Sequence, residues 1–164
     1  VDVTQDPETW THLTELQMNN DNSVTKYKTE KIIYGNKKIR RSENIQSSNN
    51  YLIYKEQLVK DFRDLCGYCG KNRNYFFDNF QIDHFRPKSK YPDLKNDYNN
   101  LVLSCPICNR NKSDDWPTND KNVYHNDSIG YVDPASKEFD EVFYRDEDGN
   151  IFSNYDYGKY MITK

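Results

Sequence analysis

The chain lacks the sequence features of membrane-spanning, fibrous and repetitive proteins. No stretch approaches the roughly 18 consecutive apolar residues that a transmembrane helix needs, which excludes a transmembrane protein and leaves no role for a membrane as partner. Glycine and proline number only six each and no period recurs, which excludes a collagen, a repeat array and a low-complexity tail.

Apolar residues are also scarce. Hydrophobic residues make up 35% of the 164 positions and the mean hydropathy is −1.10, so the core must be small for one domain of this length. Fourteen tyrosines and eight phenylalanines nevertheless argue against a disordered chain. We therefore expect something besides apolar burial to stabilise part of the chain, and the four cysteines are the obvious candidates.

Charge is unevenly distributed along the chain. The net charge of −3 gives no overall attraction to nucleic acid, yet residues 71–112 carry eight basic and four acidic side chains. Residues 113–164 carry five basic and twelve acidic ones. A local basic stretch can bind phosphate inside an acidic chain, because the field at the contact matters more than the total. Such a stretch can equally be an ordinary solvated face.

Apolar spacing, caps and turn residues predict a mixture of helices and strands. No linker is long enough to separate two domains. The expected elements are a helix over 7–17, a hairpin within 29–41, a helix over 51–65, strands over 80–85 and 101–103, a helix over 106–112, and a hairpin joining 142–144 to 151–152.

Two CxxC pairs, Cys66 with Cys69 and Cys105 with Cys108, are separated by 35 residues. Zinc prefers four soft ligands in a tetrahedron, and each CxxC turn offers two thiolates on one side of the ion. We expect a structural Zn²⁺ site, which is closed and therefore not catalytic, in a reducing, cytoplasmic compartment. Disulfides in an oxidising compartment and a redox CxxC are the alternatives.

The neighbours Asp83 and His84 lie at the end of an expected strand between the two pairs. Their side chains diverge, so the carboxylate can bind an ion while the imidazole faces a water beside it. Asp83 and Asn109 offer hard oxygen ligands for Mg²⁺ or Mn²⁺, and a histidine can take a proton from water near neutral pH. Phosphodiester hydrolysis needs this set. Taken alone, the dipeptide would be two polar residues on a surface strand.

The constellation as a whole resembles the HNH endonucleases of the ββα-metal class, in the variety whose CxxC pairs bracket the finger. The matching residues are Cys66, Cys69, Asp83, His84, Pro87, Asn100, Cys105, Cys108, Asn109 and Lys112. The resemblance implies that Asp83 and Asn109 bind the catalytic ion and that His84 activates water. It also implies that Asn100 holds the loop after the histidine. Asparagine here replaces the last histidine of the family.

The resemblance implies an α+β fold. We expect a ββα-metal finger clamped by a four-cysteine zinc site, with N-terminal helices and a C-terminal β-hairpin. The corresponding segments are a mainly helical one over 1–65, the nuclease core over 66–115 and an acidic extension over 116–164.

Basic residues flank the expected site and should position DNA by its phosphates, with little base reading. They are Arg86, Lys88 and Lys90 after the histidine, and Arg110 and Lys112 on the expected helix. Lys112 or Arg86 would steady the scissile phosphate. Residues 37–41 either extend this basic track or form a solvated face. Tyr68 either stacks on a base or covers the zinc core.

A narrower resemblance extends beyond the finger. Residues 84–89, 103–105, 108–112 and 133–134, followed by an acidic hairpin, are similar to the HNH subunit of Septu and retron-type anti-phage systems. This resemblance implies an ATPase partner subunit and a role in antiviral defence. Two other functions stay open from the residues alone. They are a zinc-stabilised nucleic-acid-binding module without catalysis and a nuclease that acts on RNA.

Overall fold

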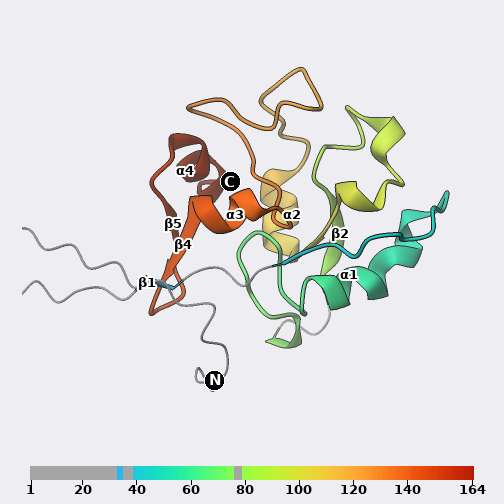
Figure 1. Ribbon diagram of the computed structural model, residues 1–164, viewed down its shortest axis with the longest axis horizontal. Helices are drawn as coiled ribbons and strands as arrows, with labels where there is room; N and C mark the ends of the chain where they lie inside the picture. Colours follow the sequence, from blue (N-terminus) through green and yellow to red (C-terminus); the bar gives the residue numbers. More distant parts are fainter. Residues whose placement is uncertain (1–32, 35–38, 76–78) are drawn as a thin grey trace, which may run out of the picture.

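The computed structural model describes residues 33–34, 39–75 and 79–164 (Figure 1). The helix expected over 7–17 lies outside the described residues. Much of the hairpin expected within 29–41 does too. Among the described residues, no helix is long and apolar enough to cross a membrane.

The described chain contains both helices and strands, which confirms a mixed fold. The strands are β1 (Ile33–Tyr34), β2 (Gln81–His84), β3 (Leu101–Ser104), β4 (Phe143–Asp146) and β5 (Ile151–Ser153). The α-helices are α1 (Lys55–Asp61), α2 (Pro106–Lys112), α3 (Lys137–Val142) and α4 (Asp156–Ile162). Short 3-10 turns are η2 (Tyr51–Tyr54), η3 (Arg73–Tyr75), η4 (Pro92–Leu94) and η5 (Tyr98–Asn100).

Two small antiparallel sheets lie in different parts of the molecule (Figure 1). Strands β2 and β3 pair in the register His84 with Leu101, and α2 follows β3 directly. Strands β4 and β5 form the expected C-terminal hairpin, and β1 adds to its β4 edge. Helices α3 and α4, which flank this hairpin, were not expected from the sequence.

The helix expected over 51–65 is shorter in the structure. It begins as the 3-10 turn η2, where the Asn50 side chain accepts a hydrogen bond from the Leu52 amide, and α1 ends at Asp61. Arg63 and Asp64 then adopt positive φ angles of 54° and 60°, which a helix cannot continue through. This turn leads the chain to the first cysteine.

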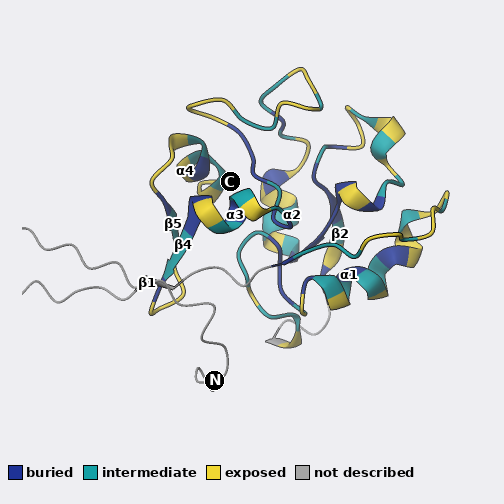
Figure 2. Ribbon diagram, in the orientation of Figure 1, coloured by how far each residue is buried: buried dark blue, intermediate teal, exposed yellow. Residues whose placement is uncertain are grey.

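The main core surrounds β3, all four residues of which are buried (Figure 2). Burial does not alternate along β3, because α1 covers one side of the strand and other core residues cover the rest. Aromatic rings extend this core towards the C-terminus, with Trp116 stacked on Tyr131 at 6.1 Å between ring centroids. A second, smaller apolar cluster is centred on α3 and β4, around Phe139 and Phe143.

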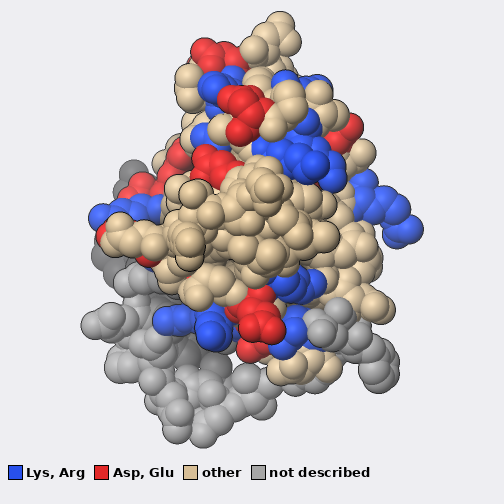
Figure 3. Space-filling model, turned by 90° about the vertical axis from the view of Figure 1, so that its right-hand side faces the viewer, with Lys and Arg blue, Asp and Glu red and all other residues tan. Residues whose placement is uncertain are grey.

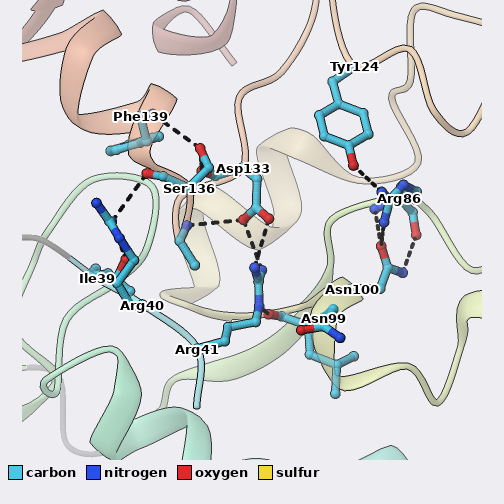
Figure 4. A network of polar contacts seen from close by, with 12 residues as sticks. Ile39, Arg40, Arg41, Arg86, Asn99, Asn100, Tyr124, Asp133, Ser136 and Phe139 are labelled. Atoms are coloured by element: carbon cyan, nitrogen blue, oxygen red, sulfur yellow. Dashed lines mark hydrogen bonds and ion pairs between the residues drawn. The ribbon is translucent and has the colours of Figure 1, made fainter. Parts of the chain in front are cut away.

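Arg41 connects three distant segments through a largely buried network (Figure 4). Its Nη1 and Nη2 donate to the two carboxylate oxygens of Asp133 at 2.7 and 3.0 Å, and its Nε donates to the Leu101 carbonyl at 3.0 Å. Its neighbour Arg40 pairs with Asp140 at 2.5 Å. Arg41 therefore neither extends a basic track nor belongs to a solvated face, whereas Arg40 is 39% exposed. Lys37 and Lys38, of the same expected basic group, lie outside the described residues.

Replacement of Arg41 by glutamine should destabilise the fold strongly, since the Asp133 carboxylate would lose its paired charge while only 18% exposed. We expect a loss of about 3 kcal/mol in the free energy of unfolding, measured by denaturant titration. Arg40→Gln is the matched control, because the Arg40 side chain is 39% exposed and should contribute less than about 1 kcal/mol. Equal losses in the two variants would contradict this interpretation.

Candidate functional site

The four cysteines meet at one point. Their Sγ atoms all lie within 4.8 Å of one another, and those of Cys69 and Cys105 are 3.9 Å apart. A tetrahedral ion with zinc–sulfur bonds of about 2.3 Å needs sulfur atoms about 3.8 Å apart. All four thiols are free of disulfides. The donor set and its spacing therefore fit Zn²⁺, in agreement with the sequence prediction of a metal site.

The backbone around the cysteines explains the two tight turns. In the first, Gly70 adopts a φ of +71° and its amide donates to the Cys66 carbonyl at 2.8 Å. In the second, Cys105 caps α2, and its Sγ accepts the Cys108 amide at 3.5 Å. The Gly67 amide donates to the Leu103 carbonyl at 2.8 Å, so β3 connects the two turns.

Cys105→Ser should unfold residues 66–112, since a site with three thiolates binds zinc more weakly and the small core offers little else. We expect less than one zinc ion per chain by elemental analysis and a lower melting temperature. Ser153→Ala is the control: it changes a buried serine on β5 and should leave the zinc content unchanged. Normal zinc content and melting in Cys105→Ser would contradict the structural role of the metal.

Asp83 and Asn109 lie on the same side of the β2–β3 hairpin. Alternation along a strand places Asp83 on the face of β2 that also carries Gln81. The Asn109 side chain, on α2, donates to the Gln81 side chain at 2.5 Å. Helix α2 thus brings the Asn109 side-chain amide to the face that carries the carboxylate. An amide oxygen and a carboxylate are donors that suit a hard divalent ion.

The Asp83 carboxylate is held from two sides. Its Oδ2 accepts a hydrogen bond from the Tyr68 hydroxyl at 2.5 Å and lies 3.2 Å from the Lys112 Nζ. Lys112 also donates to the His84 carbonyl at 2.9 Å. Burial lowers the pKa of Lys112, and the Asp83 charge opposes this shift.

Lys112 therefore does not suit the phosphate contact that we predicted for it. Its side chain is only 3% exposed, and its ammonium group binds inside the protein. Its contacts with Asp83 and with the His84 carbonyl connect α2 to the end of β2.

His84 is oriented by a backbone carbonyl. Its Nε2 lies 2.9 Å from the Lys95 oxygen, and because a carbonyl only accepts, the ring proton belongs on Nε2 and leaves Nδ1 as the basic nitrogen. The Tyr51 ring meets the imidazole edge-on at 4.7 Å between centroids. Burial lowers the pKa of His84, and the positive charge of Lys88 acts in the same direction. The neutral imidazole is thus favoured at neutral pH.

Asn100 fastens the loop that follows the histidine (Figure 4). It is completely buried, and its side chain accepts the Arg86 amide at 2.9 Å. The same side chain donates to the carbonyls of Arg86 and Leu94 at 3.0 and 3.3 Å. Both ends of the segment 86–94 are therefore tied to the residue that precedes β3.

The basic residues predicted to bind substrate divide into two groups. The Arg86 guanidinium bonds to the Lys121 carbonyl at 2.7 Å, to Asn100 and to the Tyr124 hydroxyl, and the Lys90 amine bonds to the Trp116 carbonyl at 3.2 Å. The three contacts occupy the Arg86 guanidinium within the protein, so Arg86 suits a structural role better than the phosphate contact predicted for it. Lys90 stays exposed despite its one contact.

Lys88, Lys90 and Arg110 are exposed and remain candidates for binding phosphate, and Lys88 and Arg110 have no hydrogen bond within the described residues that would compete. The Lys88 Nζ lies 5.4 Å from the centre of the Tyr51 ring, on the side of the molecule that carries His84. On the face shown in Figure 3, the basic side chains of the described residues occur in patches interrupted by acidic ones and form no continuous basic surface.

Two aromatic residues contribute contacts that the sequence did not assign. Tyr68 was expected to stack on a base or to cover the zinc core; its ring packs against the core cluster that includes Cys66 and Cys105, and its hydroxyl in addition binds Asp83. Tyr51 was expected only as an apolar position of a helix, yet its ring packs on His84. The position of Tyr68 between Cys66 and Cys69 was the only signal in the sequence that it would lie near the site. No such signal marked Tyr51.

Comparison with known proteins agrees with the geometry. Residues 66–115 match the family of HNH endonucleases, and the match spans both CxxC pairs, β2, β3 and α2. Neither the curated proteins nor the solved structures include a match to this chain. The family match supports the HNH resemblance and points to a metal-dependent nuclease. The narrower resemblance to Septu and retron-type subunits stays a prediction.

Proposed function

We propose that this chain is an HNH endonuclease that uses a divalent ion to hydrolyse phosphodiester bonds in DNA. One observation carries the proposal: the imidazole of His84, with Nδ1 as its basic nitrogen, adjoins a carboxylate whose face is shared with Asn109. A base for water and oxygen ligands for a cation are the groups that this reaction requires. The succession of β2, β3 and α2 supports a ββα-metal finger.

In this proposal, each residue near the reaction has a separate task. His84 Nδ1 takes the proton from the attacking water, while the Lys95 carbonyl keeps the ring in the required tautomer. Mg²⁺ or Mn²⁺, held by Asp83 and Asn109, would polarise the phosphate and stabilise the leaving oxygen. Asn100 acts through the loop after His84, which it holds in place.

His84→Ala should abolish cleavage, because the imidazole supplies the base, while the chain stays folded and keeps its zinc content. The assay is nicking of supercoiled plasmid by the purified chain, with and without Mn²⁺ or Mg²⁺. His125→Ala is the matched control, since His125 pairs with Glu138 at 2.7 Å and stacks on Tyr157, outside the site. Near wild-type nicking by His84→Ala would refute its role as base.

The same assay separates the alternative functions. A zinc-loaded wild-type chain that binds nucleic acid and cuts neither DNA nor RNA would be a binding module. Preferential cleavage of an RNA of the same sequence would assign the activity to RNA. The presence of Asp83, His84 and Asn109 together favours the enzyme over the binding module, because binding alone needs none of this set.

Lys88→Gln and Arg110→Gln should each weaken DNA binding and lower the slope of log affinity against log salt by about one, as expected for loss of one phosphate contact. Binding is measured at several salt concentrations in the His84→Ala background, so that no cleavage intervenes. Lys159→Gln is the control, because Lys159 is exposed and pairs with Asp156 at 2.9 Å on α4. An unchanged slope in both test variants would exclude these two contacts.

The proposal extends to antiviral defence with an ATPase partner subunit, on the narrower resemblance alone. A zinc-loaded chain that is inactive by itself and cuts DNA once the ATPase subunit is added would support it. A zinc–thiolate site and a DNA substrate both suit a reducing cytoplasm, which is the location we propose.

A further inference from the structure

Tyr68 connects the zinc site to the candidate active site. It lies between Cys66 and Cys69 in the first CxxC turn, so its backbone is held where two of the four thiolates converge. Its hydroxyl donates to Asp83 Oδ2 at 2.5 Å. A side chain carried by the zinc-binding turn thus holds the carboxylate expected to bind the catalytic ion.

The second half of the zinc site also reaches Asp83. Lys112 lies on α2, the helix that begins at the second CxxC pair, and its Nζ lies 3.2 Å from the same Oδ2 atom. Among the described residues, both contacts go to Oδ2 and no hydrogen bond to Oδ1 is found. The carboxylate is therefore fixed through one oxygen, which leaves the other as the atom suited to an ion.

We propose that Tyr68 is a positioning residue that orients Asp83 for divalent-ion binding, so that the zinc-bound turn sets the ion affinity of the active site. The inference rests on the proposed function, because it takes Asp83 as an ion ligand. A carboxylate that is already oriented loses less rotational freedom when the ion binds. A hydrogen bond to a metal ligand, from a residue that does not itself bind the ion, typically changes metal affinity 10- to 100-fold.

Tyr68→Phe isolates this hydrogen bond, because it keeps the ring and removes only the hydroxyl. We expect Mn²⁺ to bind the full zinc-loaded chain about tenfold more weakly in the variant, measured without DNA by calorimetry or by electron paramagnetic resonance. Tyr98→Phe is the matched control: its hydroxyl makes a similar bond to Asp61, at 2.6 Å, away from the site. Its Mn²⁺ affinity should equal that of the wild type.

A second measurement distinguishes positioning from a general structural defect. In Tyr68→Phe, the Mn²⁺ concentration that gives half-maximal cleavage should rise about tenfold, while the rate at saturating Mn²⁺ returns to the wild-type value. A structural defect would lower the rate at every Mn²⁺ concentration. Zinc content and melting temperature are measured on the same samples.

Three results would overturn the inference. Wild-type Mn²⁺ affinity in Tyr68→Phe would show that the hydroxyl does not act on the ion site. Loss of zinc or a lower melting temperature would show that it acts on the fold instead. If Asp83→Ala bound Mn²⁺ as the wild type does, the proposed function would fail as well, which distinguishes the two failures.

Discussion

The convergence of four thiolates is the constraint on which the rest of the structure depends. Sulfur atoms within 4.8 Å of one another bring together two turns that lie 35 residues apart in sequence. Strand β3 enters one of these turns and hydrogen-bonds to the other, through the Gly67 amide and the Leu103 carbonyl. Because apolar residues are scarce, binding of a metal at this point would supply stability that the core alone cannot.

Buried polar contacts also join segments that lie far apart in sequence. Arg41 and Asp133, 92 residues apart, form a bidentate ion pair that connects the segment before α1 to the turn before α3. Asn100 fixes both ends of the loop after His84. In a small core such contacts specify one arrangement, since each buried polar group must find its partner. The site is precise for the same reason, with Asp83 and His84 each held by more than one neighbour.

Helices were predicted well where residues within the segment mark its ends. Helix α2 spans the expected residues 106–112, because a proline at its first turn and a capping cysteine define its start. The helix expected over 51–65 ends early, since positive φ angles at Arg63 and Asp64 follow no residue pattern that spacing reveals. Helices α3 and α4 are only six and seven residues long, too short for apolar periodicity to indicate them.

The sequence by itself identified the four cysteines that the structure brings to one point, because metal-ligand chemistry depends on residue type and short spacing. It also singled out the Asp83–His84 pair, whose role stays a prediction. Only the tertiary structure decided which polar groups remain available to a substrate. Lys112 and Arg86 are both basic, but Lys112 is buried and the Arg86 guanidinium is hydrogen-bonded within the protein. Lys88, in contrast, is exposed. The partner of a long side chain depends on segments far away in sequence. Residue spacing along the chain therefore does not reveal which groups these side chains contact.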